Sequence, residues 1–133
     1  MRRRSGFALL VILVLVAASC GGDEGGTITL GGETANDHGT EDVSAESCIE
    51  FELDDFYFSP TVLQGEPGQT LALEAFNEGE AAHTFTSEEL GVDEQLDPEG
   101  EASIEITFPE SGQIVFICRF HEGQGMRGAV EVA

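Results

Sequence analysis

The chain has 133 residues, with 26 acidic residues, five arginines and no lysine, and its formal net charge is −21 at pH 7. Three of the arginines lie in the first four residues, so the chain beyond residue 19 keeps two arginines against 26 acidic residues, a net charge of −24. Such a surface repels phosphate backbones, which excludes nucleic acid as a partner and favours a basic protein. A generic acidic surface suited to high salt would explain the same charge without any partner.

Residues 1–19 are typical of a secretory signal. Arg2, Arg3 and Arg4 precede an apolar run over 7–18 that is too short for a stable membrane span. The run ends in "VAASC", which resembles the lipobox of bacterial lipoproteins, whose cysteine is lipidated and becomes the first mature residue. The resemblance implies that Cys20 anchors the protein on the outer, extracytoplasmic face of the membrane. The alternative is an ordinary signal cleaved nearby, with Cys20 incidental.

Residues 20–47 follow as a Gly-rich, acidic segment with few large apolar side chains. A segment of this composition buries too little apolar surface to offset the entropy of ordering its chain. It is therefore predicted to be a disordered tether between the lipid and a folded domain, with His38 a solvated bystander.

Residues 48–133 are long enough for one small domain with a modest core. The segments "CIEFELD", "TLALEAF", "ASIEITF" and "GQIVFICRF" alternate apolar and polar residues, and turn-rich stretches such as "LDPEGE" separate them. Short strands without a helical crossover predict an all-β domain with antiparallel pairing, either a two-sheet sandwich or a barrel. The alternation in the first strand breaks at Asp54 and Asp55.

Metal-ligating residues gather near the end of the chain. Cys118, His121 and Met126 follow the pattern C-x2-H-x4-M, and His83 stands upstream in "EAAHTFT". Two imidazoles, one thiolate and a weak axial thioether are the ligands of a blue-copper electron-transfer centre. Each residue alone could have a structural role, as a buried cysteine, a loop histidine, a core methionine or a strand-end histidine.

The segment 48–133 resembles a cupredoxin of the plastocyanin type, both in "FYFSPTVLQGEPGQTLALEAFNEGEAAHTFT" and in "GQIVFICRFHEGQGMRGAVEV". The resemblance implies a Greek-key β-sandwich with one type 1 copper per chain, held by His83, Cys118, His121 and Met126. It also implies that His83 comes from a strand end and the other three from the loop between the last two strands.

Two departures from the family pattern affect the site. Plastocyanin-like loops often carry a proline after the second histidine, whereas Gly123 and Gly125 occupy this loop and predict a looser one. Thr84 follows the first histidine in place of the usual asparagine, so the hydrogen bonding around the thiolate cannot be carried over. Cys48 has no obvious partner and is expected to be buried on the first strand.

These features predict a membrane-tethered, monomeric single-electron carrier outside the cytoplasm, serving a redox partner protein that could be basic. The alternative is a copper-binding lipoprotein for delivery or storage without redox turnover. An enzyme is not expected, because the paired H-x-H motifs of multicopper oxidases and a recognisable Ser-His-acid spacing are both missing. Arg119 and Arg127 flank the ligand loop and are expected either to guide docking or to pair with carboxylates such as Glu122.

Overall fold

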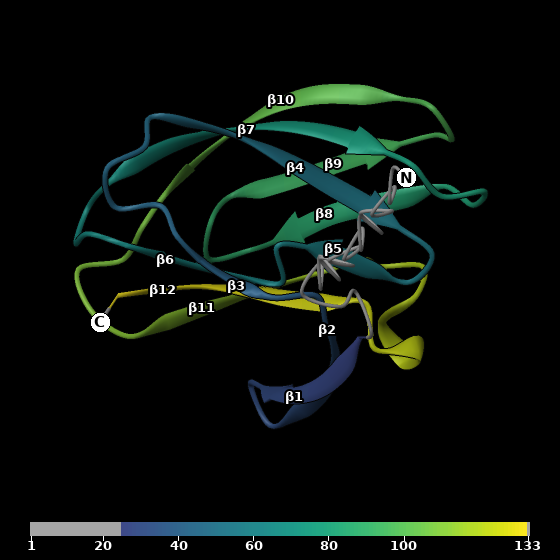
Figure 1. Ribbon diagram of the computed structural model, residues 1–133, viewed down its shortest axis with the longest axis horizontal. Helices are drawn as coiled ribbons and strands as arrows, with labels where there is room; N and C mark the ends of the chain where they lie inside the picture. The colour runs from purple at the N-terminus through teal and green to yellow at the C-terminus, as the bar shows by residue number, and fades with distance from the viewer. Residues whose placement is uncertain (1–24, 133) are drawn as a thin grey trace, which may run out of the picture.

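The computed structural model describes residues 25–132, and Figure 1 shows two β-sheets packed face to face with a separate hairpin beside them. The four-stranded sheet runs in the order β10 (Glu101–Thr107), β7 (Thr70–Asn77), β4 (Cys48–Asp54), β5 (Tyr57–Ser59). The six-stranded sheet runs in the order β3 (Thr40–Asp42), β6 (Val62–Gly65), β12 (Arg127–Val132), β11 (Gln113–Ile117), β8 (His83–Ser87), β9 (Val92–Leu96). The hairpin pairs β1 (Gly26–Leu30) with β2 (Glu33–Asp37), and one 3-10 turn, η1, spans Glu122–Gln124. The predicted all-β sandwich is confirmed.

The core lies between the two sheets because alternate residues of each strand point inward. In β4 the apolar residues Ile49, Phe51 and Leu53 are buried while the glutamates between them are exposed. Across the sandwich, the rings of Phe51, Phe85 and Phe116 make edge-to-face and stacked contacts with centroids 4.4–5.9 Å apart. This aromatic core supports β8 and β11, whose ends carry the candidate ligands.

The strand pairing differs from the expected antiparallel pattern in three places. β4 pairs with β7, β12 with β6 and β3 with β6 in parallel, while the other strand pairs are antiparallel. Between β4 and β7 the chain passes through β6, which belongs to the other sheet. The chain thus returns to its first sheet in the same direction and needs no helical crossover.

The predicted disordered tether is wrong for residues 26–42, which form β1, β2 and β3. Leu30 and Ala35 of the hairpin are buried against Val62 and Ala129, on the side of the six-stranded sheet away from the main core. A segment of this composition cannot bury enough of its own surface to order by itself, but a few small apolar side chains suffice where another element already offers an apolar face. The folded domain therefore begins well before residue 48.

Two further expectations within the domain are corrected. Cys48 is exposed, since it shares the outward face of β4 with Glu50, and its Sγ lies 3.8 Å from Oε1 of Glu74. His38 is half-buried, and its ring stacks on Tyr57 with centroids 3.4 Å apart. The signal segment 1–19 and Cys20 lie outside the described residues. Within residues 25–132, no helix is long and apolar enough to cross a membrane.

Candidate metal centre

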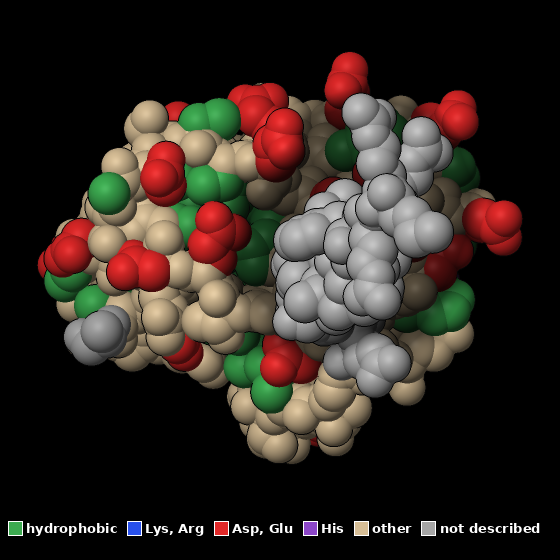
Figure 2. Space-filling view, in the orientation of Figure 1, with side chains coloured by type: hydrophobic (Ala, Val, Ile, Leu, Met, Phe, Trp, Pro, Cys, Tyr) green, Lys and Arg blue, Asp and Glu red, His purple; other side chains and the backbone are tan. Residues whose placement is uncertain are grey.

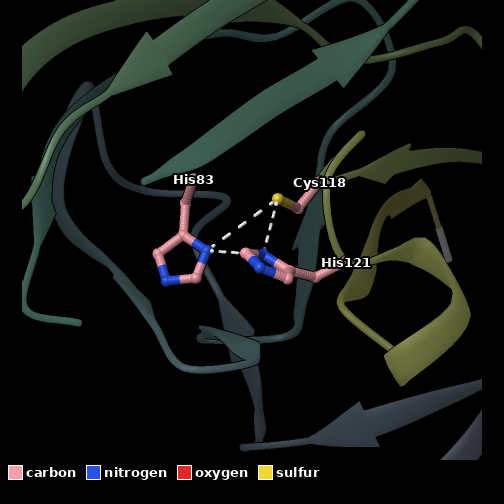
Figure 3. Close-up of side chains that lie close together, drawn as sticks. All are labelled: His83, Cys118 and His121. Carbon is pink, nitrogen blue, oxygen red and sulfur yellow. Dashed lines mark hydrogen bonds between the residues drawn. The ribbon is translucent and has the colours of Figure 1, made fainter. Parts of the chain in front are cut away.

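Three of the predicted ligands converge at one end of the sandwich, and Figure 3 shows their donor atoms facing one another. His83 opens β8, Cys118 directly follows β11, and His121 precedes η1. The Nδ1 atoms of the two histidines are 3.1 Å apart, and the Sγ of Cys118 lies 3.4 Å from Nδ1 of His121 and 3.9 Å from Nδ1 of His83.

This spacing fits a single metal ion. Typical bonds of about 2.0 Å to imidazole nitrogen and about 2.3 Å to thiolate, set in a trigonal plane, place two nitrogens roughly 3.5 Å apart and nitrogen and sulfur roughly 3.8 Å apart. The three observed separations, 3.1, 3.4 and 3.9 Å, lie close to those values. The donors thus already surround a point that a metal ion could occupy, and two imidazoles with one thiolate suit copper.

The orientation of His83 is set by Asp55, whose carboxylate oxygen lies 2.7 Å from Nε2. A carboxylate only accepts hydrogen bonds, so Nε2 carries the proton and Nδ1 presents its lone pair to the other donors. Asp55 is held in turn by the backbone N–H groups of Glu80 and Ala81. The N–H of Glu80 is the main cause that lowers the pKa of Asp55, so the carboxylate stays ionised.

Cys118 is fully buried, and the backbone N–H of Thr84 donates to its Sγ at 3.3 Å. The Thr84 hydroxyl accepts a hydrogen bond from the N–H of Arg119 at 2.9 Å, which joins β8 to the residue after the thiolate. The threonine in place of asparagine therefore keeps a hydrogen bond to the sulfur and adds a bond between the two ligand-bearing segments. Such contacts steady a thiolate and tune a bound metal.

His121 is only half-buried, whereas His83, Cys118 and Met126 are buried. Its ring packs against Phe56, with centroids 4.5 Å apart, and the neighbouring Phe120 is 47% exposed. Burial, followed by the interaction with the neighbouring His83, lowers the pKa of His121. The imidazole is therefore neutral near pH 7, which is the form that binds metal.

Met126 is anchored through its backbone to two other candidate ligands. Its carbonyl accepts from the N–H of Cys118 at 3.0 Å, and its N–H donates to the carbonyl of His121 at 3.2 Å. The intervening residues form η1, which ends at Gly125 in the left-handed conformation with φ +83°. The loop predicted to be loose is therefore a hydrogen-bonded turn. Glycine at position 125 adopts without strain the positive φ that closes this turn.

Both arginines within residues 25–132 pair with carboxylates. Arg119 lies 2.9 Å from Asp93, and Arg127 lies 2.9 Å from Glu122, the partner that the sequence suggested. The Arg127 side chain is 10% exposed, so of the two only Arg119 projects into solvent to a large extent.

Sequence reasoning missed Asp55 and Phe56, which contact the two histidines. The only signal was the break in alternation at Asp54 and Asp55, which marks where the chain leaves β4 and turns towards the site. A carboxylate in a turn has many possible roles, and nothing in the chain order links it to a histidine 28 residues away.

A two-sheet sandwich with His, Cys and His donors at one end defines a class of copper-binding β-proteins, and the geometry is compatible with a type 1 site. The model of the cupredoxin-like domain family matches residues 8–132, and the chain belongs to that family. The match begins well before residue 48, in agreement with the strands found there.

Several solved structures share the fold. Auracyanin from Roseiflexus castenholzii is 20% identical with a TM-score of 0.54, covering 66% of this chain and 98% of its own. Plastocyanin from the fern Dryopteris crassirhizoma is 20% identical with a TM-score of 0.51, covering 64% and 100%. The metal-binding domain of the Cu(I)-exporting ATPase CopA from Streptococcus pneumoniae, solved with Cu(I), is 19% identical with a TM-score of 0.57, covering 71% and 95%. No curated protein sequence matched the chain.

Proposed function

We propose that the protein is a single-electron carrier that binds one type 1 copper ion through His83, Cys118, His121 and Met126, and that it is not an enzyme. The observation that supports this most is the convergence of the donor atoms of His83, Cys118 and His121 within 3.1–3.9 Å. Bound copper would supply one-electron redox chemistry. Auracyanin and plastocyanin, which share the fold, have been solved in reduced and oxidised forms respectively.

The protein's part is to hold the donors so that little moves when an electron arrives. Asp55 directs the lone pair of His83 inward, and the Thr84 N–H holds the sulfur of Cys118. Three of the four proposed ligands are buried, which keeps water away from the sulfur and the thioether. Only His121 reaches the surface, so its exposed edge is the proposed route for electrons to and from a partner.

We place the protein outside the cytoplasm, anchored through a lipid on Cys20, on the basis of the signal-like residues 1–19. Because β1 begins at Gly26, only the five residues 21–25 would separate the lipidated cysteine from the first strand. Fully extended, they would span about 20 Å. The carrier would therefore work close to the membrane surface, instead of searching a wide volume on a long tether.

The partner is proposed to be a redox protein with a basic docking surface. Figure 2 shows Asp and Glu side chains scattered over one face of the sandwich, with no Lys or Arg of the described residues visible there. Both described arginines are engaged with carboxylates, so they offer little positive charge to an acidic partner. Attraction between the acidic carrier and a basic partner would weaken as salt is added.

Copper delivery or storage is the second candidate function, and the likeness to the CopA domain solved with Cu(I) favours it. The two functions differ in whether the site accepts both oxidation states. The described chain carries no methionine- or histidine-rich repeat of the kind that hands metal on, since Met126 is its only methionine. This composition favours the electron carrier.

The test is the absorption spectrum of protein lacking residues 1–19 after addition of one equivalent of Cu(II). An electron carrier should show an intense visible thiolate-to-copper band that reductant bleaches and oxidant restores. The control is Cys118→Ser, which should bind Cu(II) without this band. A colourless wild-type protein that binds only Cu(I) tightly would favour delivery or storage.

A further inference from the structure

The N-terminal hairpin reaches the ligand loop through Asn36, a residue of β2. Its side-chain amide donates one hydrogen bond to the carbonyl of Gln124, at 2.8 Å, and one to the carbonyl of Phe56, at 2.9 Å. Its backbone N–H donates a third to the carbonyl of Gly125, also at 2.9 Å. One residue of the segment predicted to be a tether thus binds the loop that joins His121 to Met126.

Asn36 also packs directly on this loop. A β-carbon added to Gly125 would lie 3.1–3.2 Å from three atoms of the Asn36 side chain, so the two residues are in close contact. Gly123 and Gly125 have more backbone freedom than other residues, and a loop that contains both would sample several conformations if nothing held it. Asn36 limits this freedom from the outside, while η1 closes the loop from within.

The second hydrogen bond of the Asn36 side-chain amide links the hairpin to the segment that contacts both histidines. Phe56, whose carbonyl accepts it, packs its ring on His121, and the preceding Asp55 holds Nε2 of His83. The side-chain amide of Asn36 therefore joins the backbone at Gln124 to the backbone at Phe56, and both segments carry or contact candidate ligands.

The hairpin is anchored independently of these bonds. Leu30 and Ala35 pack on Val62 and Ala129 of the six-stranded sheet, and the turn residue Gly31 lies against Val115. Figure 1 shows the hairpin beside the yellow η1 turn, outside the two main sheets. Because this packing fixes β2, Asn36 can act as a support for the loop and does not merely follow it.

We propose that Asn36 is a positioning residue that holds residues 121–126 in the arrangement that binds metal. Its role in the loop does not depend on which metal binds, whereas its effect on copper rests on the proposed function. The consequence is that the hairpin is part of the metal centre's supporting structure, although it contributes no ligand.

The first experiment is hydrogen–deuterium exchange on metal-free protein lacking residues 1–19, comparing wild type with Asn36→Asp and Asn36→Ala. Asn36→Asp keeps the shape of the side chain but replaces both N–H donors with a charged acceptor, whereas Asn36→Ala removes the amide without adding charge. Loss of the two hydrogen bonds is common to both variants, and the added charge belongs to Asn36→Asp alone. We expect exchange of the amides of Gln124, Gly125 and Met126 to be on the order of tenfold faster in both variants. The amides of β4 and β7 should exchange as in wild type.

The matched control is Thr34→Ala, an exposed position on the same strand, which should leave loop exchange unchanged. Unchanged loop exchange in Asn36→Asp would overturn the proposal. Faster exchange throughout the sandwich would overturn it too, because Asn36 would then act on the stability of the whole fold.

The second experiment measures release of copper from loaded protein to an excess of chelator. We expect release to be several-fold faster from Asn36→Asp than from wild type or Thr34→Ala, since the loop must open to free the ion. Equal rates would contradict a positioning role towards the metal. If the wild-type protein shows no visible band, the proposed electron-carrier function fails, but the exchange experiment on metal-free protein still decides the role of Asn36.

Discussion

Asp55 and His83 lie 28 positions apart in the chain, and the carboxylate oxygen of Asp55 is 2.7 Å from Nε2 of His83. The carboxylate fixes which ring nitrogen carries the proton and places a negative charge next to a proposed copper ligand. That charge would stabilise the more positive oxidation state of a bound ion. The Asp55–His83 pair would therefore lower the reduction potential of a bound copper ion.

We expect Asp55→Asn to raise the reduction potential by tens of millivolts, because the amide oxygen can still accept from Nε2 while the charge is lost. Asp55→Ala should also weaken copper binding, since His83 loses its hydrogen-bond partner. Voltammetry of copper-loaded protein measures the potential. The control is Glu110→Gln, a charge removed beyond the far end of β11 from Cys118, and a shift of equal size there would indicate an effect of net charge alone.

Met126→Leu should keep the visible band and raise the potential, because a weak axial thioether tunes a type 1 site more than it holds the metal. The side chain is fully buried, and leucine is close to methionine in volume, so the metal-free protein should lose no more than about 1.5 kcal/mol in its free energy of unfolding. Absorption spectra, voltammetry and urea unfolding measure the three effects. An unchanged potential would mean that the Met126 sulfur does not approach the copper.

Arg119→Ala and Arg127→Ala should differ in their effect on stability. The Arg119–Asp93 pair is largely exposed, and removing it should change the free energy of unfolding by less than about 1 kcal/mol. The Arg127 side chain is 10% exposed and lies against Gly31 in the hairpin turn. Its removal should lower the free energy of unfolding by roughly 1–3 kcal/mol, through lost packing and an unpaired Glu122. Urea unfolding of metal-free protein provides the comparison, and equal effects would contradict the different burial of the two side chains.

Cys20→Ala should release the protein from the membrane fraction or block its maturation, if the lipid is attached there. Fractionation of expressing cells and immunoblotting distinguish the two outcomes. Cys48→Ala is the matched control, because it removes an exposed cysteine that the proposal leaves unmodified. Tight membrane association of the Cys20→Ala protein would count against the lipobox assignment.

The strand pattern and the C-x2-H-x4-M spacing could be read from the sequence because both are local. Alternation in "CIEFELD" follows from the two-residue repeat of a strand, and the structure buries Ile49, Phe51 and Leu53 as expected. Cys118, His121 and Met126 fall within nine consecutive residues, so they share one short segment in whatever fold carries it. The sequence alone therefore determined the fold class and a candidate site, whose copper ligation stays a prediction.

The tertiary structure decided what surrounds those donors. Asp55 reaches His83 only because the turn after β4 lies beside the start of β8. Asn36 reaches Gln124 only because the hairpin packs on an apolar face of the six-stranded sheet. Local composition suggested a disordered tether for residues 20–47, since it describes what a segment can bury by itself. Whether a segment orders depends on the surface that the rest of the chain offers it, and that surface exists only once the sheets have formed.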